Sequence, residues 1–327
     1  MDGITLRDPK FGSQARIAVD LGCSCYSFET VVDGRRWETL YAHPEFAAGQ
    51  QRPSGSGIPI LFPFPGRLRG DQFEWGGVRY PMPHRDPLGN AIHGAVYTRP
   101  WRLVDHTAQE MTAEFQASRD GVDGRVNWPS DYRIRLTYRL AGNSLAARIE
   151  VLNCGDARLP YGLGLHPYFR LSPIGQQGWT DVRLHVPVTR RWPLHEMLPT
   201  GDSEPADPRL SSPDGLLLDE VQLDDVFSNC ARSEDGWARS ELLLKRELIR
   251  VAVEWDAGWD RCVLFTPPHR EAVCIEPYST LPNAPELESR GVATGWRELA
   301  PGECDRLDFR VTVSSFESIN DTSADRN

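Results

Sequence analysis

The sequence predicts an all-β protein, a large antiparallel β-sandwich, and three observations support this prediction. The 327 residues include 28 glycines and 26 prolines, roughly a sixth of the chain against a usual share of about 12%, and both residues break helices. Apolar and polar residues alternate with a period of two along the chain, which is typical of strands with one buried face. No segment carries a sustained 3.6-residue apolar stripe with caps, so we expect few helices.

The clearest element is a hairpin over residues 132–151. Apolar side chains occupy one face of 132–140 and mostly arginine the other. Ala-Gly-Asn-Ser at 141–144 supplies turn residues before the alternation resumes at 145–151. A tight hairpin is predicted over 73–80, around Gly76 and Gly77. Further strands are predicted, in chain order, at 16–20, 26–32, 101–104, 112–117, 182–186, 241–255, 262–265, 272–276 and 307–316.

These strands are predicted to belong to one domain. A dozen or more strands with few helices bury a chain of this length only as stacked antiparallel sheets. Residues 199–215 have the composition of a loop, but alternation resumes after them, and no internal repeat or linker divides the chain. We therefore expect a single sandwich domain over residues 1–319 and a disordered tail over residues 320–327.

Charge and cysteine usage exclude several classes of partner. With 36 basic and 46 acidic residues the formal net charge is −10, and without a lysine or arginine run such a surface repels nucleic acid. The longest apolar stretch, 58–64, is too short to span a bilayer, and residues 1–16 lack the apolar region of a secretory signal. Seven scattered cysteines without a Cys-x-x-Cys pair favour reduced thiols in a cytoplasmic protein.

Cofactor and nucleophile motifs are missing from the sequence. Gly162 and Gly164 are not followed by the third glycine and the helix of a dinucleotide-binding loop. The sequence has neither a Gly-x-Ser-x-Gly elbow nor a phosphate-binding loop of the Gly-x4-Gly-Lys-Ser/Thr type. We therefore expect no cofactor, no metal, and no covalent or phosphoryl-transfer chemistry.

Two of the eight histidines have unusual neighbours. His166 lies among apolar and aromatic residues, and the following Pro167 forces it into an extended backbone and removes one ladder donor. His93 precedes Gly94, which leaves room for a close approach to the backbone. For each histidine taken alone, a hydrogen-bonded structural role is the alternative.

Four further charged residues, at three places in the chain, are candidates for chemistry. Glu276 ends an apolar strand, where a carboxyl of raised pKa can serve as a base near neutral pH; the alternative is a salt bridge with Arg67 or Arg261. Arg67 follows Pro-Phe-Pro-Gly, a rigid approach that would fix a guanidinium for hydroxyls or a carboxylate; the alternative is a surface arginine. Asp224 and Asp225 lie between apolar residues, and only one of them can point inward from a strand; the alternative is a turn or a cap.

Taken together, these segments resemble the aldose 1-epimerase (galactose mutarotase-like) family. The resemblance covers about residues 57 to 283 and rests on five short motifs in family order: Gly-Ile-Pro-Ile-Leu-Phe-Pro-Phe-Pro-Gly-Arg-Leu (57–68), Asn-Ala-Ile-His-Gly (90–94), Leu-His-Pro-Tyr-Phe (165–169), Leu-Asp-Asp-Val-Phe (223–227) and Ile-Glu-Pro (275–277). One departure is that the family typically has asparagine before the arginine, where this chain has Gly66.

The resemblance implies a galactose mutarotase-like supersandwich that interconverts the α and β anomers of a free aldose without metal or redox cofactor. It implies Glu276 as the base and His166 as the acid, in roles that reverse when the ring closes. It implies Arg67, His93 and Asp224 as the residues that hold the hydroxyls of a monosaccharide substrate, with Asp224 matching the family aspartate better than Asp225. A monomer and a homodimer are both compatible with the sequence.

Four alternatives remain open from the sequence. A hexose-6-phosphate 1-epimerase on the same fold would need a basic pocket, and a non-catalytic carbohydrate-binding protein would bind sugar without speeding anomer exchange. A glycoside hydrolase would use Glu276 with Asp224, and a metal-dependent β-barrel enzyme would use His93, His166 and Glu276 as ligands. The candidates for the basic pocket are Arg67, Arg69, Arg79, Arg85 and Arg99.

Overall fold

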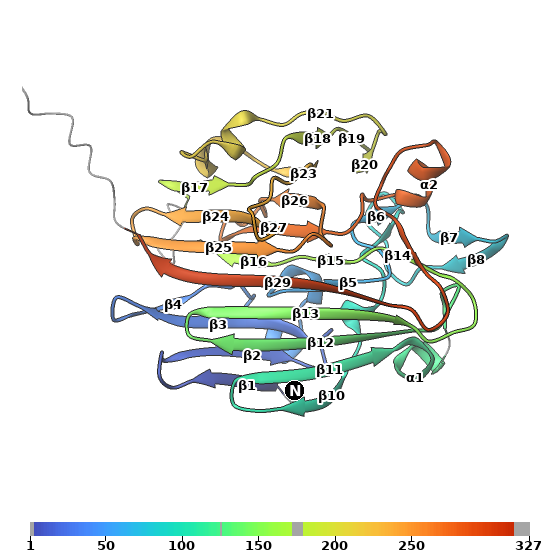
Figure 1. Cartoon of the computed structure of the whole chain (residues 1–327), viewed down its shortest axis with the longest axis horizontal. Helices are drawn as coiled ribbons and strands as arrows, with labels where there is room; N and C mark the ends of the chain where they lie inside the picture. The colour runs from blue at the N-terminus through green and yellow to red at the C-terminus, as the bar shows by residue number, and fades with distance from the viewer. Residues whose placement is uncertain (1–2, 125, 172–178, 317–327) are drawn as a thin grey trace, which may run out of the picture.

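The computed structural model describes residues 3–124, 126–171 and 179–316. Within them the strands form a sandwich of antiparallel sheets with two short α-helices, α1 (Ala117–Asp120) and α2 (Ala284–Ser289) (Figure 1). This confirms the predicted all-β sandwich. Helices in the described ranges are all too short or too polar to cross a membrane. The expected tail over 320–327 lies outside the described residues, and the domain limits 1–319 stay a prediction.

The first layer is a nine-stranded sheet that includes the predicted 132–151 hairpin as β12 and β13. The long strands β12, β13 and β29 run side by side across the molecule (Figure 1). The order across the sheet is β10 (Arg102–His106), β11 (Glu110–Gln116), β12 (Tyr132–Ala141), β13 (Ser144–Asn153), β29 (Cys304–Ser315), β25 (Ile249–Trp255), β24 (Ala238–Leu244), β17 (Val182–His185) and β22 (Leu216–Leu217).

The second layer combines an eight-stranded and a four-stranded sheet, which the isolated bridges Cys25–Ile58 and Leu40–Phe169 connect. The eight-stranded sheet has the order β21 (Glu204–Pro205), β18 (Arg190–Trp192), β23 (Asp224–Ser228), β26 (Arg261–Phe265), β27 (Ala272–Tyr278), β15 (Gly164–Leu165) and β5 (Ile60–Leu61), with β16 (Tyr168–Arg170) also paired to β27. The four-stranded sheet consists of β1 (Gly3–Asp8), β2 (Ser13–Ala18), β3 (Ser24–Val32) and β4 (Arg35–Glu38).

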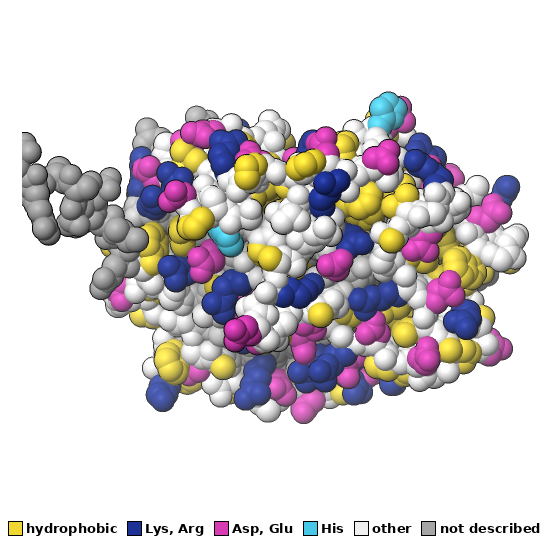
Figure 2. All heavy atoms as spheres, turned by 45° about the horizontal axis from the view of Figure 1, so that its top comes forward, with side chains coloured by type: hydrophobic (Ala, Val, Ile, Leu, Met, Phe, Trp, Pro, Cys, Tyr) yellow, Lys and Arg dark blue, Asp and Glu magenta, His cyan; other side chains and the backbone are white. Residues whose placement is uncertain are grey.

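Short ribbons and single turns of 3-10 helix complete the fold. The ribbons are β6 (Arg67–Leu68) with β9 (Ala91–Ile92), β7 (Gln72–Trp75) with β8 (Val78–Pro81), β14 (Leu159–Tyr161) with β28 (Arg297–Leu299), and β19 (Leu194–His195) with β20 (Leu198–Pro199). The 3-10 turns are η1 (Phe46–Ala48), η2 (Pro53–Gly55), η3 (Val96–Thr98), η4 (Val122–Gly124), η6 (Pro208–Ser211) and η7 (Leu218–Glu220). On the face shown in Figure 2, basic and acidic side chains are interspersed.

Alternation sorts the side chains of the eight-stranded sheet onto two faces. On β27, Val273 and Ile275 enter a large apolar core to which all three large sheets contribute. Cys274, Glu276 and Tyr278, which alternate with them, lie on the opposite face, and Cys274 and Tyr278 belong to separate small clusters there. The outer face of this sheet therefore combines buried polar and apolar groups, and the candidate site is built on it.

Most predicted strands are confirmed, and the predicted 73–80 hairpin is β7–β8. The single strand predicted over 241–255 is wrong, because it is the hairpin β24–β25. The polar residues 245–247 turn the chain there, and Leu248 takes a left-handed backbone with φ of 56°. The sequence did not predict the two-residue strands β5, β15 and β22, because two residues are too few to show a period.

Candidate active site

A cavity of about 200 Å³ opens on the outer face of the eight-stranded sheet, and all five predicted site residues line it. It is smaller than the usual ligand pocket of about 300–1,000 Å³, so its size suits one sugar ring better than an oligosaccharide. The ribbon β19–β20, the ribbon strand β6 and α2 gather at this end of the sheet (Figure 1). The predicted residues that line the cavity are Arg67, His93, His166, Asp224 and Glu276.

The register of β27 with its neighbours places His166 opposite Glu276. Gly164 of β15 pairs with Tyr278, and Tyr168 of β16 pairs with Cys274, in the same antiparallel register. The residue midway between them, His166, therefore faces Glu276, and its Nδ1 lies 3.4 Å from Glu276 Oε1. Because Pro167 follows it, His166 sits at a break in the ladder, where its N–H donates to the Pro59 carbonyl instead.

Glu276 is almost fully buried, with 1% of its surface exposed. Tyr278 donates a hydrogen bond from its hydroxyl to Glu276 Oε2 at 2.8 Å. Burial raises the pKa of Glu276 well above its ordinary value, although this hydrogen bond acts in the opposite direction. Neither arginine considered for a salt bridge with Glu276 forms it, since Arg67 binds Asp86 and Arg261 binds Asp260.

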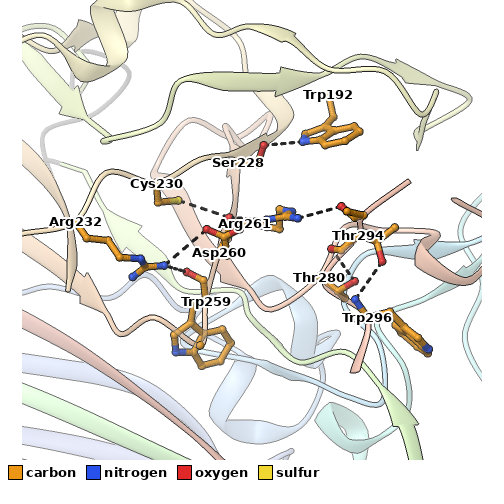
Figure 3. Close-up of polar contacts among 12 residues, drawn as sticks. Trp192, Ser228, Cys230, Arg232, Trp259, Asp260, Arg261, Thr280, Thr294 and Trp296 are labelled. Atoms are coloured by element: carbon orange, nitrogen blue, oxygen red, sulfur yellow. Dashed lines mark hydrogen bonds and ion pairs between the residues drawn. The ribbon is translucent and has the colours of Figure 1, made fainter. Parts of the chain in front are cut away.

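Arg261 instead connects the sheet to the segment that follows α2 (Figure 3). Besides Asp260, its guanidinium donates to the Ala293 carbonyl at 3.2 Å. In the same region the Thr280 hydroxyl donates to the Thr294 carbonyl at 3.3 Å. These bonds hold both ends of the 280–294 segment, which carries Pro282 against the cavity.

His166 is held by aromatic packing rather than by hydrogen bonds of its ring. Its imidazole stacks on Tyr168 with 4.7 Å between centroids and 3° between planes, and Phe265 contacts it edge-on. Nδ1 is buried and makes no hydrogen bond with any described residue. Burial lowers the pKa of His166 to about 3.

His93 also packs against His166, with ring centroids 5.5 Å apart in an edge-on arrangement. Its backbone has φ of 61°, and its N–H donates to the Gly66 carbonyl. Gly94 is required here because a Cβ would lie 2.0 Å from the Phe62 carbonyl oxygen. Burial lowers the pKa of His93 well below its ordinary value, and nearby His166 adds to this effect.

Arg67 is fixed by Asp86, a carboxylate that the sequence did not single out. Arg67 Nε donates to Asp86 Oδ2 at 2.8 Å, and Asp86 Oδ1 accepts the N–H groups of Leu88 and Asn90. Burial acts to raise the pKa of Asp86, but these hydrogen bonds outweigh it and leave the pKa below its ordinary value. The guanidinium is thus held from one side and lines the cavity, as the rigid segment before it predicted.

Alternation on β23 separates the two neighbouring acids. Asp224 lines the cavity, whereas Asp225 forms an ion pair with Arg191 of β18 at 2.7 Å. Asp224 is therefore the acid available to a ligand. Although Asp224 is exposed, partial desolvation raises its pKa above the ordinary value, while Arg67 acts to lower it.

Gly66 lines the same cavity and has a left-handed backbone with φ of 63°. A Cβ at this position would approach Pro282 Cγ to 2.8 Å. The glycine found in place of the family asparagine is thus matched by a proline that occupies part of the space a side chain would need.

The sequence analysis missed several cavity residues, among them two tyrosines and an arginine. Tyr278 lies two residues after Glu276, where alternation alone could have placed it on the same face. Tyr168 lies in the quoted Leu-His-Pro-Tyr-Phe motif and stacks on His166. Arg52 lines the cavity, and no sequence signal distinguishes it from other loop arginines.

The structure bears on two of the open alternatives. Of the arginines considered for a phosphate pocket, only Arg67 lines this cavity. Arg69, Arg79 and Arg85 form ion pairs with Glu286, Glu74 and Asp71, and Arg99 lines a different cavity. Among the described residues, the metal-type cluster consists of His166, Cys274 and Glu276, and not of the His93, His166 and Glu276 that the metal-enzyme alternative would use.

Comparisons with known proteins agree with this geometry. A family model described as aldose 1-epimerase matches residues 35–310. The uncharacterized protein YphB of Escherichia coli K12 is 32% identical over 114 residues, which are 35% of this chain and 37% of YphB. Galactose mutarotase of Rattus norvegicus is 27% identical over 143 residues, 43% of this chain and 40% of that protein. These matches span only about two fifths of the length of each relative.

Solved structures resemble the chain over almost its whole length. A galactose mutarotase-like protein from Clostridium acetobutylicum superposes with a TM-score of 0.80 at 20% identity, over 93% of both chains. An aldose epimerase homologue from C. elegans gives 0.78 at 16% identity, over 97% of this chain and 99% of the other. At such identities the likeness shows the fold, and the family model covers most of the sequence. The chain therefore belongs to the aldose 1-epimerase family.

Proposed function

We propose that this protein is a mutarotase, an isomerase that interconverts the α and β anomers of a free aldose. The observation that carries the proposal is the pair His166 and Glu276, which face each other from β27 and the segment between β15 and β16, with Nδ1 and Oε1 3.4 Å apart, in a cavity suited to one sugar ring. A general acid and a general base in one site are what ring opening requires.

The reaction is a pair of proton transfers. Glu276 takes the proton of the C1 hydroxyl while His166 gives a proton to the ring oxygen, and the bond between C1 and the ring oxygen breaks to leave an open-chain aldehyde. Rotation about the C1–C2 bond presents the other face of the aldehyde. The hydroxyl formed from the former ring oxygen then attacks C1 and returns its proton to His166. Glu276 returns its proton to the oxygen at C1, which becomes the new C1 hydroxyl. Each positioned transfer contributes on the order of 10²–10⁴-fold.

Burial acts on both groups before a sugar binds. It lowers the pKa of His166 and raises that of Glu276, so it favours the neutral imidazole and the neutral carboxylic acid. The reactive form is carboxylate and imidazolium. The hydroxyl and ring oxygen of a bound sugar stabilise that form because they bring dipoles to the pair.

The remaining polar groups suit the substrate hydroxyls. Arg67, fixed by Asp86, offers its free N–H donors, and Asp224 offers acceptors from the neighbouring strand. His93 lines the cavity beside them. Holding the ring at these groups leaves C1 free to rotate and restricts the rest of the sugar.

Polarimetry on freshly dissolved α-anomers of hexoses and pentoses tests the proposal. The wild-type protein should speed the approach to equilibrium for at least one aldose. Glu276→Gln should reduce that acceleration by about 10²–10⁴-fold with the fold intact by circular dichroism. Asp225→Asn, which alters a carboxylate facing Arg191 outside the cavity, serves as the control. Wild-type rates in Glu276→Gln, or no acceleration with any aldose, would refute the proposal.

Arg52 favours a second candidate, a sugar 6-phosphate as substrate. Arg52 lines the cavity and, among the described residues, forms no ion pair with a carboxylate, whereas Arg67 is neutralised by Asp86. Such a free cation suits a phosphate. Comparing glucose with glucose 6-phosphate separates the candidates: if the phosphate is the substrate, Arg52→Ala should raise its KM at least tenfold and leave the free sugar unaffected.

We also propose a cytoplasmic location. All seven cysteines lie within the described residues, and none is in a disulfide. Five of them are buried, where free thiols pack as small apolar groups. Fractionation of cells followed by immunodetection tests this, and recovery outside the cytoplasm would contradict it.

A further inference from the structure

Three side chains with metal-ligating atoms meet beside the cavity: His166 and Glu276 line it, and Cys274 is buried next to them. One ligand atom each from His166, Cys274 and Glu276 lies within 4.8 Å of the other two. All three residues are buried, with exposures of 6%, 0% and 1%. We propose that this cluster binds one Zn²⁺ ion, or another thiophilic divalent cation, and that the bound ion stops the proton transfer at the site.

Strand register holds the three ligands in place. Cys274 and Glu276 are two apart on β27, so alternation puts both side chains on the outer face of the sheet. His166 lies opposite Glu276 between β15 and β16, and Tyr168, opposite Cys274, stacks on the imidazole. Two of the three ligands thus lie on a hydrogen-bonded strand, which keeps ligand geometry better than a loop does.

The buried imidazole nitrogen is the second observation that points to a ligand. His166 Nδ1 is buried, faces Glu276 at 3.4 Å, and has no hydrogen-bond partner among the described residues. A buried polar atom left unpaired destabilises the fold. A cation between the imidazole and the carboxylate would satisfy that atom.

The donor set selects the metal. Thiolate, imidazole and carboxylate together are zinc ligands, whereas Ca²⁺ and Mg²⁺ prefer oxygen alone. Tetrahedral zinc with bonds of about 2.0–2.3 Å places its ligand atoms about 3.3–3.8 Å apart. The pair His166 and Glu276 already has that separation, and a shift of roughly 1 Å brings in a third atom at the 4.8 Å limit. The fourth position would be open to the cavity.

Binding and inhibition are separate consequences. Zinc uses the lone pairs of His166 and Glu276, the same groups that the proposed mutarotation uses, so ion and sugar should compete. The prediction that zinc inhibits rests on the proposed function. The prediction that zinc binds does not, because it concerns only the three ligands.

Zinc binding is measured on the full-length wild-type protein after chelator treatment. We expect one Zn²⁺ per chain by elemental analysis after gel filtration, and a matching isotherm by calorimetry. Cys274→Ala should weaken binding at least tenfold. Cys262→Ala is the control, because Cys262 is also buried but lies in the large core on the opposite face. Absence of stoichiometric zinc in the wild type, or equal affinity in Cys274→Ala, would overturn the proposal.

A spectroscopic measurement covers the case in which Cys274→Ala does not fold. Cd²⁺ bound to the wild-type protein should give the ultraviolet charge-transfer band of a cadmium–thiolate bond, and Cys154→Ser with Cys304→Ser should keep it, since these two exposed thiols are outside the cluster. Loss of the band in that double variant would place the metal on the surface and overturn the proposal.

Measurements of anomer exchange test whether the bound ion inhibits the reaction. Zinc at saturating concentration should abolish anomer exchange, and EDTA should restore it, while Cys274→Ala keeps its basal activity and resists zinc. Full wild-type activity with the cluster saturated by zinc would overturn the inhibitory role. If the wild type has no mutarotase activity, the proposed function fails, and the stoichiometry still decides the metal site.

Discussion

The buried imidazole of His166 should make the stability of the protein depend on pH. Its pKa is lowered by burial to about 3, against an ordinary value of about 6.5 in the unfolded chain. Below about pH 6.5 the unfolded state therefore binds a proton that the folded state does not. The free energy of unfolding must fall as pH falls, with a slope approaching about 1.4 kcal/mol per pH unit.

Between pH 7.5 and pH 5.0 this single group should remove about 2 kcal/mol of stability. His166→Gln abolishes that contribution, so its free energy of unfolding should decrease about 2 kcal/mol less than that of the wild type over the same interval. Urea denaturation at the two pH values measures the difference. His195→Gln, at an exposed histidine of the β19–β20 ribbon, should behave like the wild type. Parallel pH dependences for wild type and His166→Gln would refute the view that burial keeps this imidazole neutral.

Three further predictions concern the groups around the proposed substrate. Arg67→Ala should raise KM at least tenfold, and an unchanged KM by polarimetry would contradict its place in the site. The same variant should lower the free energy of unfolding by about 1–3 kcal/mol, because it leaves the buried Asp86 without its cation. Asp224→Asn should raise KM while Asp225→Asn does not, and equal effects in steady-state kinetics would show that alternation on β23 was misjudged. Gly66→Ala should lower the melting temperature, because its backbone is left-handed and its Cβ would meet a proline, and an unchanged melting curve would show that the loop adapts.

Much of this site could be predicted because its titratable residues stand next to prolines and glycines, which constrain the backbone. His166 and Glu276 each precede a proline at the end of an apolar run, and both lie where strands of the second layer meet. Gly94 marks a real close approach, since the Phe62 carbonyl occupies the space of its missing side chain. Such positions are unusual enough to be noticed one at a time.

What the sequence could not supply is the register between distant strands. That His166 lies opposite Glu276 follows from the pairing of β15 and β16 with β27, across more than a hundred residues, and no local pattern encodes that pairing. The same holds for Asp86, which reaches Arg67 through the β6–β9 ribbon. The hairpin within 241–255 was missed for a local reason. Apolar and polar residues alternate on both sides of its short polar turn, so the two strands were taken for one.

The most direct test of the paired proton transfer is anomer exchange measured at equilibrium by saturation transfer between the anomeric proton resonances of a turned-over aldose. Because Glu276 and His166 are proposed to act together in one pair of proton transfers, Glu276→Gln and His166→Gln should each lose about 10²–10⁴-fold in exchange rate, and the double variant should lose no more than the worse single one. Multiplying losses in the double variant, or wild-type exchange in either single variant, would show that the two groups do not act as one unit.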